Sequence, residues 1–251
     1  MKAAYHGGMS GSRPNPPRRV LLKLSGQALK GEEHAGISPG EVERMAGLVA
    51  AVHGDGIETA CVIGGGNIFR GLGAETRGMD RVTADSMGML ATLINALAVQ
   101  ESLEKLGCQT RVMSAIAVRQ VAEPFIRRRA LRHLEKGRIT LFAAGTGNPY
   151  FSTDTAAALR ANEIRADVLI KATRVPGVFT GDPEKDPEAR PIRRLTYLEA
   201  IRQELRFMDT TAISLCMEND LPIVVCHQDD IQQAARGDDV GTRVETPALE
   251  E

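Results

Sequence analysis

The sequence predicts an α/β fold in which a central, mostly parallel sheet is covered by helices on both faces, forming a three-layer αβα sandwich. Short apolar runs alternate along the chain with longer segments of helical periodicity, without an internal repeat. Strands of a parallel sheet are covered on both faces, so they read as continuous apolar runs. Glycine-rich segments follow several of these runs directly, at the position where ligands bind in open α/β sheets.

The apolar runs predict the strands in chain order. They are residues 19–24, 57–63, 110–117, 139–144, 167–172, 221–226 and 241–245. Helix starts are marked by their caps: Ser38-Pro39 places a capping serine before a proline suited to the first helical position, and Thr196–Glu199 has the capping-box pattern. Helices are predicted at residues 38–52, 85–106, 123–135, after 152–154, after 196, after 209 as far as 217, and at 229–236.

The composition is that of a globular protein and disfavours two classes of partner. The chain has 251 residues, of which 43% are hydrophobic and 25% charged, and its formal net charge is -1. This balance, with 4% aromatic residues and no Trp, disfavours binding to nucleic acid by charge or by base stacking. No apolar stretch approaches the ~20 residues that cross a bilayer, so no membrane partner is expected.

The cysteines and histidines show no metal-binding spacing, because neither a Cys-x-x-Cys nor a His-Glu-x-x-His motif occurs. Reduced intracellular thiols are expected. Residues 1–18 lack the apolar core of a signal peptide, and they predict a disordered N-terminal tail. Residues 19–246 are predicted to form one domain, and residues 247–251 a short C-terminal tail.

The segment from Ala143 to Ala158 carries the strongest local signal for a site. A buried strand leads into it, Gly145 and Gly147 let the backbone turn and approach a ligand, and a helix begins after Ser152. A helix N-terminus offers free N–H groups and a partial positive charge to an anion. The alternative interpretation is an ordinary βα connection.

Two further segments suit phosphate. Lys23 lies near the end of the first strand and is followed by Ser25-Gly26; it is either an edge lysine or a phosphate ligand. Gly64-Gly65-Gly66 follows the second strand and is either an anion-binding nest or a flexible turn. Arg70, shortly after the nest, favours phosphate.

Two charged features permit two interpretations each. Asp85 lies near the start of a predicted helix, where it either caps the helix or accepts hydrogen bonds from ligand hydroxyls. The helix of residues 123–135 carries four arginines, which form either a solvated face or a partner surface. Those arginines are Arg127, Arg128, Arg129 and Arg132.

Five motifs, in order along residues 19–246, resemble those of the bacterial uridylate (UMP) kinases of the amino-acid kinase family. The Thr-Gly-Asn-Pro run at 146–149 separates UMP kinases from other members of that family. The motifs are Lys23–Gly26, Gly64–Gly71, Asp85–Thr92, Gly145–Asp154 and Lys171–Pro183.

The resemblance implies two substrate sites. The N-terminal part is expected to bind UMP, with Asp85 holding the ribose and the loop of residues 146–153 enclosing the nucleotide. The residues implied for UMP are Gly65, Asp85, Thr146, Gly147, Asn148, Pro149, Tyr150, Phe151, Ser152 and Thr153. Residues 167–246 are expected to bind ATP. The residues implied for ATP are Lys23, Leu24, Ser25, Gly26, Gly66, Arg70, Thr173, Phe179 and Asp182.

Lys23, Arg70 and Asp154 are the implied catalytic residues, while Lys171 and Asp209 lie in matching motifs without an assigned role. At the start of a helix, Asp154 has a second interpretation, as an N-cap. The capping interpretation predicts that Asp154→Asn is nearly harmless, since Asn caps about as well. The catalytic interpretation predicts a large loss of rate at an unchanged melting temperature.

The implied reaction is Mg²⁺-dependent transfer of a phosphoryl group from ATP to UMP, within CTP biosynthesis. No protein ligand for Mg²⁺ is expected, because ATP oxygens and waters suffice. The resemblance also implies a cytoplasmic homohexamer inhibited by UTP and activated by GTP, although Gly31–Gly36 departs from the loop associated with the GTP response. Two alternatives are a kinase that phosphorylates a carboxylate, such as acetylglutamate, and a nucleotide-binding storage or regulatory protein.

Overall fold

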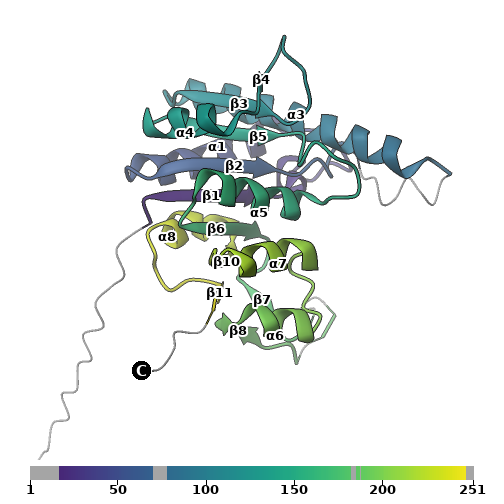
Figure 1. Ribbon diagram of the computed structural model, residues 1–251, viewed down its shortest axis with the longest axis vertical. Coiled ribbons are helices and arrows are strands. Elements are labelled where there is room, and N and C mark those ends of the chain that lie inside the picture. Colours follow the sequence, from purple (N-terminus) through teal and green to yellow (C-terminus); the bar gives the residue numbers. More distant parts are fainter. Residues whose placement is uncertain (1–16, 70–77, 182–184, 187, 247–251) are drawn as a thin grey trace, which may run out of the picture.

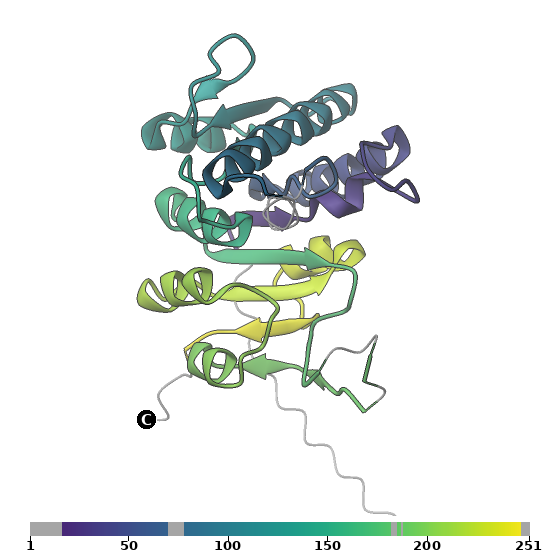
Figure 2. The same ribbon diagram turned by 90° about the vertical axis from the view of Figure 1, so that its right-hand side faces the viewer.

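The computed structural model describes residues 17–69, 78–181, 185–186 and 188–246. Within these residues the chain forms a nine-stranded sheet in the order β4-β3-β5-β2-β1-β6-β10-β11-β9, and all neighbouring strands are parallel except β10 and β11. The sheet and its helix layers are seen in Figure 1 and Figure 2. The predicted three-layer α/β class is confirmed.

The seven strands predicted from apolar runs are present, with ends that differ by a few residues, whereas β4 and β9 were not predicted. Residues 167–172, for example, shift by one position to Val168–Thr173. The strands of the large sheet are β1 (Arg19–Leu24), β2 (Glu58–Ile63), β3 (Thr110–Ser114), β4 (Glu123–Pro124), β5 (Ile139–Ala143), β6 (Val168–Thr173), β9 (Arg194–Leu195), β10 (Ile223–His227) and β11 (Thr242–Val244). A separate antiparallel pair joins β7 (Val178–Phe179) to β8 (Pro191–Ile192).

Two helix layers cover the two faces of the sheet. On one face lie α1 (Pro39–Gly54), α3 (Arg81–Lys105) and α8 (Ile231–Ala235), packed against one cluster of buried residues. On the other face lie α4 (Arg127–Glu135), α5 (Thr153–Ile164), α6 (Tyr197–Arg202) and α7 (Thr210–Glu218), packed against a second cluster. Short 3₁₀ turns, η1 (Gly26–Leu29) and η3 (Gln228–Asp230), follow β1 and β10.

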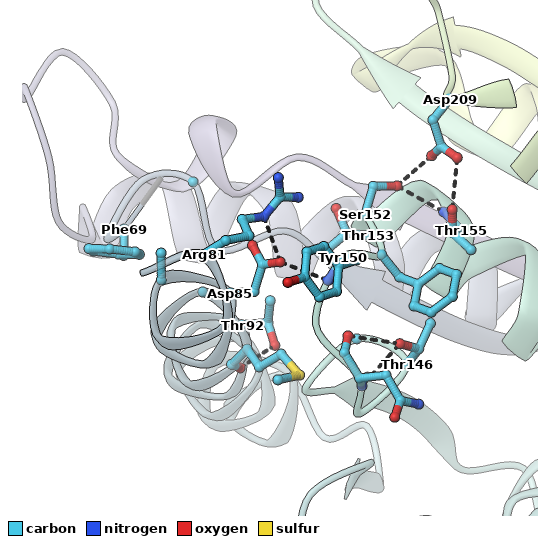
Figure 3. Close-up of a pocket in the computed structure, with 18 of the residues that line it drawn as sticks. Phe69, Arg81, Asp85, Thr92, Thr146, Tyr150, Ser152, Thr153, Thr155 and Asp209 are labelled. Carbon is cyan, nitrogen blue, oxygen red and sulfur yellow. Dashed lines mark hydrogen bonds and ion pairs between the residues drawn. The ribbon is translucent and has the colours of Figure 1, made fainter. Parts of the chain in front are cut away.

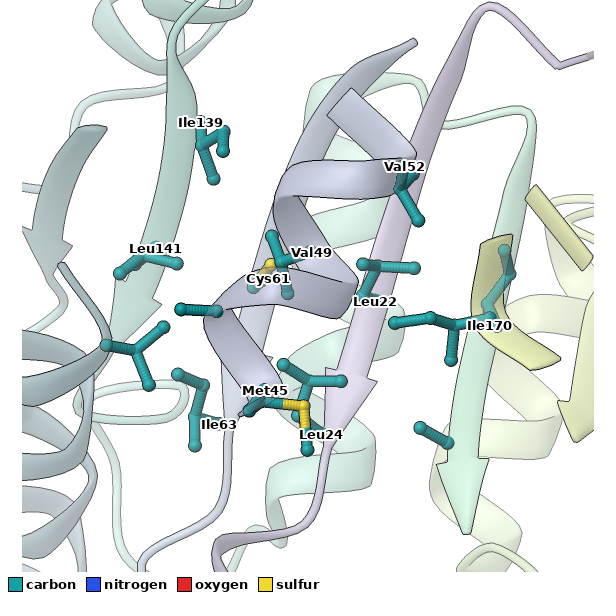
Figure 4. Packing of buried hydrophobic residues seen from close by; sticks show 14 of the residues in the cluster. Leu22, Leu24, Met45, Val49, Val52, Cys61, Ile63, Ile139, Leu141 and Ile170 are labelled. Atoms are coloured by element: carbon teal, nitrogen blue, oxygen red, sulfur yellow. The ribbon is translucent and has the colours of Figure 1, made fainter. Parts of the chain in front are cut away.

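Alternate residues of the central strand supply the two clusters, because successive side chains of a strand point to opposite faces. Leu22 and Leu24 of β1 pack with α1 in the cluster shown in Figure 4, while Leu21 belongs to the cluster under α5 and α7. Cys61 and Cys226 are fully buried and unpaired, as their apolar surroundings predict. Burial of both faces therefore holds β1, with Lys23 near its end, in a fixed position.

Three predicted boundaries are wrong for local reasons. Helix α3 begins four residues earlier than predicted, because Asp80 accepts a hydrogen bond from the backbone N–H of Thr83 and caps the helix. Residues 123–124 form the edge strand β4 rather than the start of a helix, so α4 begins at Arg127. The strand predicted at 110–117 ends at Ser114.

Helix α3 is long and apolar enough, by length and composition, to cross a membrane, with a mean hydropathy of 1.4 over its best 18-residue window. The sequence prediction that no apolar stretch approaches this length overlooked it. In the fold, α3 lies against α1, β3 and β5, and 39% of that window is buried. The apolar residues on its inner face therefore belong to the core.

The predicted tails fall almost entirely outside the described residues. Arg18, which the sequence places in the N-terminal tail, is described: its backbone N–H donates to the Asp167 carboxylate at 2.8 Å. Two residues implied for the site, Arg70 and Asp182, also lie outside the described residues.

Candidate functional site

The candidate site opens at the carboxyl ends of β2 and β5, where the sequence predicts ligand binding. A cavity of about 780 Å³ lies between the first turns of α3 and the loop that precedes α5 (Figure 3). The residues implied for UMP that line it are Gly65, Asp85, Thr146, Asn148, Tyr150, Phe151, Ser152 and Thr153, joined by Gly66 from the set implied for ATP. Gly147 and Pro149 shape the loop without lining the cavity.

The loop before α5 is held in an unusual backbone conformation. Four of its residues have positive φ angles, between 58° and 85°: Ala144, Gly145, Gly147 and Tyr150. Residues other than glycine rarely adopt such angles, because their side chains then clash with the backbone. A Cβ atom on Gly147 would also lie 3.1 Å from the carbonyl oxygen of Ala115. Glycine is therefore needed here for both conformation and close approach.

Polar groups around the loop fix this conformation. The Thr146 hydroxyl accepts a hydrogen bond from the backbone N–H of Asn148 at 3.2 Å. The Thr92 hydroxyl of α3 accepts one from the backbone N–H of Ala144 at 2.8 Å. Behind the loop, the buried Arg160 stacks on Phe125, with its guanidinium carbon 3.9 Å from the ring centroid, and donates to the Gly145 carbonyl. The loop is thus built into the fold before any ligand binds.

The segment Gly64–Gly66 is fixed, which excludes the flexible-turn interpretation. The buried Asn95 side chain of α3 donates to the Gly64 carbonyl at 2.7 Å and exchanges hydrogen bonds with the buried Asn67. A Cβ on Gly65 would lie 2.8 Å from the Gly88 carbonyl oxygen and 2.9 Å from the Ala91 Cβ. The glycine run therefore lets β2 end in direct contact with α3.

Asp85 lies in the second turn of α3 and is not its cap. Its Oδ2 atom accepts hydrogen bonds from Arg81 Nε at 2.8 Å and from the backbone N–H of Tyr150 at 2.7 Å (Figure 3). The carboxylate lines the cavity and ties its two walls together. The capping interpretation of Asp85 is wrong, since Asp80 holds that position.

Lys23, Asp154 and Lys171 form a nearly buried ionic cluster beside the cavity. Lys23 Nζ lies 2.7 Å from Asp154 Oδ1, and Lys171 Nζ lies 2.6 Å from Asp154 Oδ2. The three side chains are 11–15% exposed. Lys171 also donates to the backbone carbonyl of Phe207. The sequence predicts two of these residues as catalytic, and the structure adds Lys171 from the neighbouring strand.

The cluster shifts the pKa values of its members. Burial by itself raises the pKa of Asp154, but attraction to Lys23 and Lys171 outweighs burial and holds the pKa below its ordinary value. Burial and then repulsion from Lys23 lower the pKa of Lys171, against the attraction of Asp154. Asp154 is thus held ionised as the counter-charge of two ammonium groups.

Ser152, and not Asp154, is the N-cap of α5. The Ser152 hydroxyl accepts hydrogen bonds from the backbone N–H groups of Asp154 and Thr155, both at 3.0 Å.

Asp209 caps α7 by accepting from the backbone N–H of Ala212 at 3.0 Å. It also accepts from the hydroxyls of Ser152 and Thr155, so one carboxylate joins the starts of α5 and α7. Sequence reasoning left Asp209 without a role.

Two smaller cavities reach the ionic cluster from other sides. One, of about 240 Å³, is lined by Lys23, Ser25, Lys171 and Thr173 among others. Another, of about 660 Å³, is lined by Asp154, Lys171, Asp209 and residues between α6 and α7. The Thr173 hydroxyl lies 2.6 Å from the Val175 carbonyl oxygen, to which it donates, and 3.2 Å from that of Cys226. Leu24, Gly26 and Phe179 line none of these three cavities: Leu24 and Gly26 are buried, and Phe179 lies in the β7–β8 pair.

Within the described residues, no group of three or more His, Cys, Asp or Glu side chains could hold a metal ion. Both oxygens of Asp154 face ammonium groups, so this carboxylate does not fit the role of a Mg²⁺ ligand. Mg²⁺ carried by the phosphates of a nucleotide remains an expectation.

A family model described as the amino acid kinase family matches residues 18–227. The fold is similar to the crystal structure of UMP kinase from Bacillus anthracis, with a TM-score of 0.90 and 39% identity over 93% of this chain and 98% of that one. It is also similar to UMP kinase from Ureaplasma parvum, with a TM-score of 0.85 and 32% identity over 91% of this chain and 99% of that one.

Uridylate kinase from Archaeoglobus fulgidus is a more distant neighbour, with a TM-score of 0.70 and 25% identity over 90% of this chain and 99% of that one. The family match spans the sheet from β1 to β10, including all three members of the ionic cluster. The family model covers most of the chain and the fold agrees with it, so the chain belongs to the amino acid kinase family.

Proposed function

We propose that the protein is a UMP kinase, which transfers the γ-phosphoryl group of ATP to UMP and releases ADP and UDP within CTP biosynthesis. One observation carries the proposal: Lys23 and Lys171 of the ionic cluster line a cavity together with Ser25 and Thr173. Their partner Asp154 comes directly between Thr153 and Thr155, which line the cavity of the residues implied for UMP. Its similarity to two solved UMP kinases supports the choice of acceptor.

The chemistry requires positioning more than proton transfer. The nucleophile is a phosphate oxygen of UMP, which is anionic at neutral pH, so no general base is needed. The barrier lies in bringing two anionic phosphates into line, and a fixed positive field lowers it. With both ammonium groups charged, the cluster carries two positive charges against one negative charge and supplies such a field.

The roles within the cluster follow from its contacts. Lys23 is proposed to contact the transferring phosphoryl group, since it lies at the end of β1 beside the fixed glycine segments Gly26 and Gly64–Gly66. Asp154 orients both ammonium groups by its charge. Lys171, anchored to the Phe207 carbonyl, is proposed as the second cation on the nucleotide phosphates.

Mg²⁺ is proposed to enter with ATP, held by phosphate oxygens and water, where it neutralises charge on the phosphates. Arg70 is proposed as a further phosphate-binding cation. It follows the fixed segment Gly64–Gly66 in sequence, although it lies outside the described residues.

The acceptor is tested by coupling ADP release to a spectroscopic readout with UMP, CMP, acetylglutamate and aspartate as parallel acceptors. Turnover of UMP well above the other three is expected. Preference for acetylglutamate or aspartate would replace the proposal with carboxylate phosphorylation. Nucleotide binding without ADP release from any acceptor would favour a storage or regulatory protein.

The ribose assignment has its own test. If Asp85 accepts a hydrogen bond from the ribose 2′-hydroxyl, UMP is preferred over dUMP, because loss of a buried hydrogen-bond partner costs about 1–3 kcal/mol. Equal kcat/KM for UMP and dUMP would remove that role from Asp85.

We further propose a cytoplasmic homohexamer that UTP inhibits. Activation by GTP is left out of the proposal, because Gly31–Gly36 departs from the loop associated with the GTP response. Exposed apolar residues on the outer face of α3 support self-association: Val82, Met87, Leu90 and Ile94 are 39–49% exposed. The Gly31–Gly36 segment exchanges backbone and side-chain hydrogen bonds with Asn67, beside the glycine run. A ligand that moved this segment would therefore act on the site through Asn67.

A further inference from the structure

Arg81, which the sequence analysis did not single out, lines the main cavity beside Asp85. It occupies the first position of α3, one helical turn before Asp85, and its Nε donates to Asp85 Oδ2 at 2.8 Å. The Arg81 side chain is 30% exposed and that of Asp85 is 17% exposed, so the pair is partly withdrawn from water.

The same arginine contacts the opposite wall of the cavity. Its guanidinium carbon lies 5.5 Å from the centroid of the Tyr150 ring, within the range of a cation–π contact. The backbone N–H of Tyr150 donates to the same Oδ2 atom at 2.7 Å. Arg81, Asp85 and Tyr150 thus form a closed bridge between α3 and the loop before α5 (Figure 3).

The bridge uses one oxygen of the carboxylate. Oδ2 accepts from both Arg81 and Tyr150, whereas Oδ1 accepts no hydrogen bond from any described residue. Two donors on Oδ2 restrict rotation of the carboxylate about its terminal bond, which is otherwise a broad torsion. Oδ1 is consequently held at one position in the wall of the cavity, available to a ligand hydroxyl.

The bridge also supports a disfavoured backbone conformation. Tyr150 has a φ of 72° although it carries a side chain, and such a conformation persists only where the surroundings hold it. The hydrogen bond from its N–H and the contact of its ring with Arg81 both do so. Removal of Arg81 is therefore expected to loosen the loop and the carboxylate together.

We infer that Arg81 is a positioning residue that sets the selectivity for a ribose over a 2′-deoxyribose, by fixing Asp85 Oδ1 to receive the 2′-hydroxyl and holding Tyr150 over the nucleotide. This inference rests on the proposed function, because it assigns a residue to discrimination at the same acceptor site. A guanidinium group suits this role because it is planar. Its N–H groups can bond the Asp85 carboxylate in the plane of the group, while its face contacts the Tyr150 ring.

The test compares Arg81→Gln, Arg81→Lys, Asp85→Asn and the Arg81→Gln/Asp85→Asn double variant, with kcat and KM measured for UMP and dUMP at saturating ATP. In Arg81→Gln, the ratio of kcat/KM for UMP over that for dUMP should fall about 5- to 10-fold, the worth of one well-placed hydrogen bond. The change should lie mainly in KM for UMP rather than in kcat.

Two further outcomes would show that Arg81 acts through its contact with Asp85. Arg81→Lys should recover only part of the selectivity, since an ammonium lacks the planar fork. The double variant should be no less selective than Asp85→Asn alone, because Arg81 acts through Asp85. Arg236→Gln is the matched control: Arg236 forms an ion pair of similar length with Asp55, at 2.7 Å, just after the ends of α8 and α1 and away from the cavity, and it should leave selectivity unchanged.

Three results would overturn the inference. An unchanged UMP-to-dUMP ratio in Arg81→Gln would show that Asp85 needs no positioning. An equal rise in KM for both nucleotides would show that Arg81 binds a group that both share. A lower KM for UMP would show that Arg81 competes with the ribose for Asp85.

A calorimetric titration with UMP and dUMP separates this inference from the proposed reaction. Wild-type protein that binds UMP over dUMP without forming ADP would refute the reaction, and the variants would still test Arg81 through the two dissociation constants. Wild-type protein that binds neither nucleotide would refute both. Melting curves of each variant confirm that it is folded.

Discussion

At the scale of single residues, the position of Asp154 between two ammonium groups determines what its substitution does. The sequence alone offers a helix cap or a catalytic carboxylate, and it predicts an unchanged melting temperature for the catalytic case. The structure removes the capping role, which Ser152 holds. It also shows that the carboxylate pairs with two nearly buried cations, so its loss affects folding as well as rate.

Asp154→Asn is expected to lose at least about 10²-fold in kcat, because misplaced catalytic groups cost on that order. It should also destabilise the fold by about 3–5 kcal/mol, since removal of one partner leaves buried charge uncompensated. Steady-state kinetics at saturating ATP and UMP and a denaturant titration measure the two effects.

The double variant Asp154→Asn/Lys171→Met separates these effects. Removing a cation together with the anion should recover much of the stability, while kcat stays low. A single variant that retains most of its kcat would disprove the catalytic assignment of Asp154.

Lys23→Ala is expected to lower kcat about 10²-fold or more, the usual effect of removing one group aimed at charge in the transition state. The fold should be retained, because Asp154 keeps Lys171 as its partner. Lys23→Arg, which preserves the charge, should recover part of the rate. An unchanged kcat with a raised KM for ATP would instead show that Lys23 binds ground state and transition state equally.

At the scale of secondary-structure elements, the site depends on how closely β2 and α3 approach each other. Gly65 makes this contact possible, and Asn95 of α3 holds the Gly64 carbonyl. The sequence alone permits two interpretations of the glycine run, an anion-binding nest or a loose turn. The buried asparagine pair that rules out the loose turn comes from two segments 28 residues apart.

Gly65→Ala is expected to destabilise the protein by about 1–3 kcal/mol, because the added methyl overpacks the contact with α3. The KM for UMP should rise as the glycine segment shifts. Gly47→Ala is the control, since a Cβ at this exposed position of α1 meets no atom within 4 Å; in a helix interior it should stabilise by about 0.5–1 kcal/mol. Denaturant titrations of both variants make the comparison, and a neutral Gly65→Ala would contradict the close contact.

At the scale of the whole molecule, one face of α3 belongs to the core and the other remains exposed. Its inner side packs on the sheet, while apolar side chains gather on its outer side. A contiguous exposed apolar surface is typical of an interface. The proposed oligomer would cover this face and bring copies of the acceptor cavity, which the first turns of α3 line, close to the interface.

Ile94→Glu is therefore expected to shift the protein towards the monomer in light scattering at micromolar concentration, because a charge would be buried in the interface. Leu198→Glu is the matched control: Leu198 is 50% exposed and Ile94 is 49% exposed, but Leu198 lies on α6 across the sheet. A monomeric wild type, or equal effects of the two substitutions, would contradict assembly through α3.

The sequence by itself determined the fold class and, through its motifs, most residues of the proposed substrate and catalytic sites. Continuous apolar runs predict buried strands, and the motifs identify the loop of residues 146–153, Asp85 and Lys23, because these signals are local.

Only the tertiary structure decided which charges meet. Lys171 joins Asp154 because β1 and β6 are adjacent and parallel, and Asp209 reaches Ser152 across 57 residues. Arg81 meets Tyr150 because α3 lies against the loop before α5. Such pairings depend on strand order and helix packing, which no periodicity or spacing in one sequence specifies.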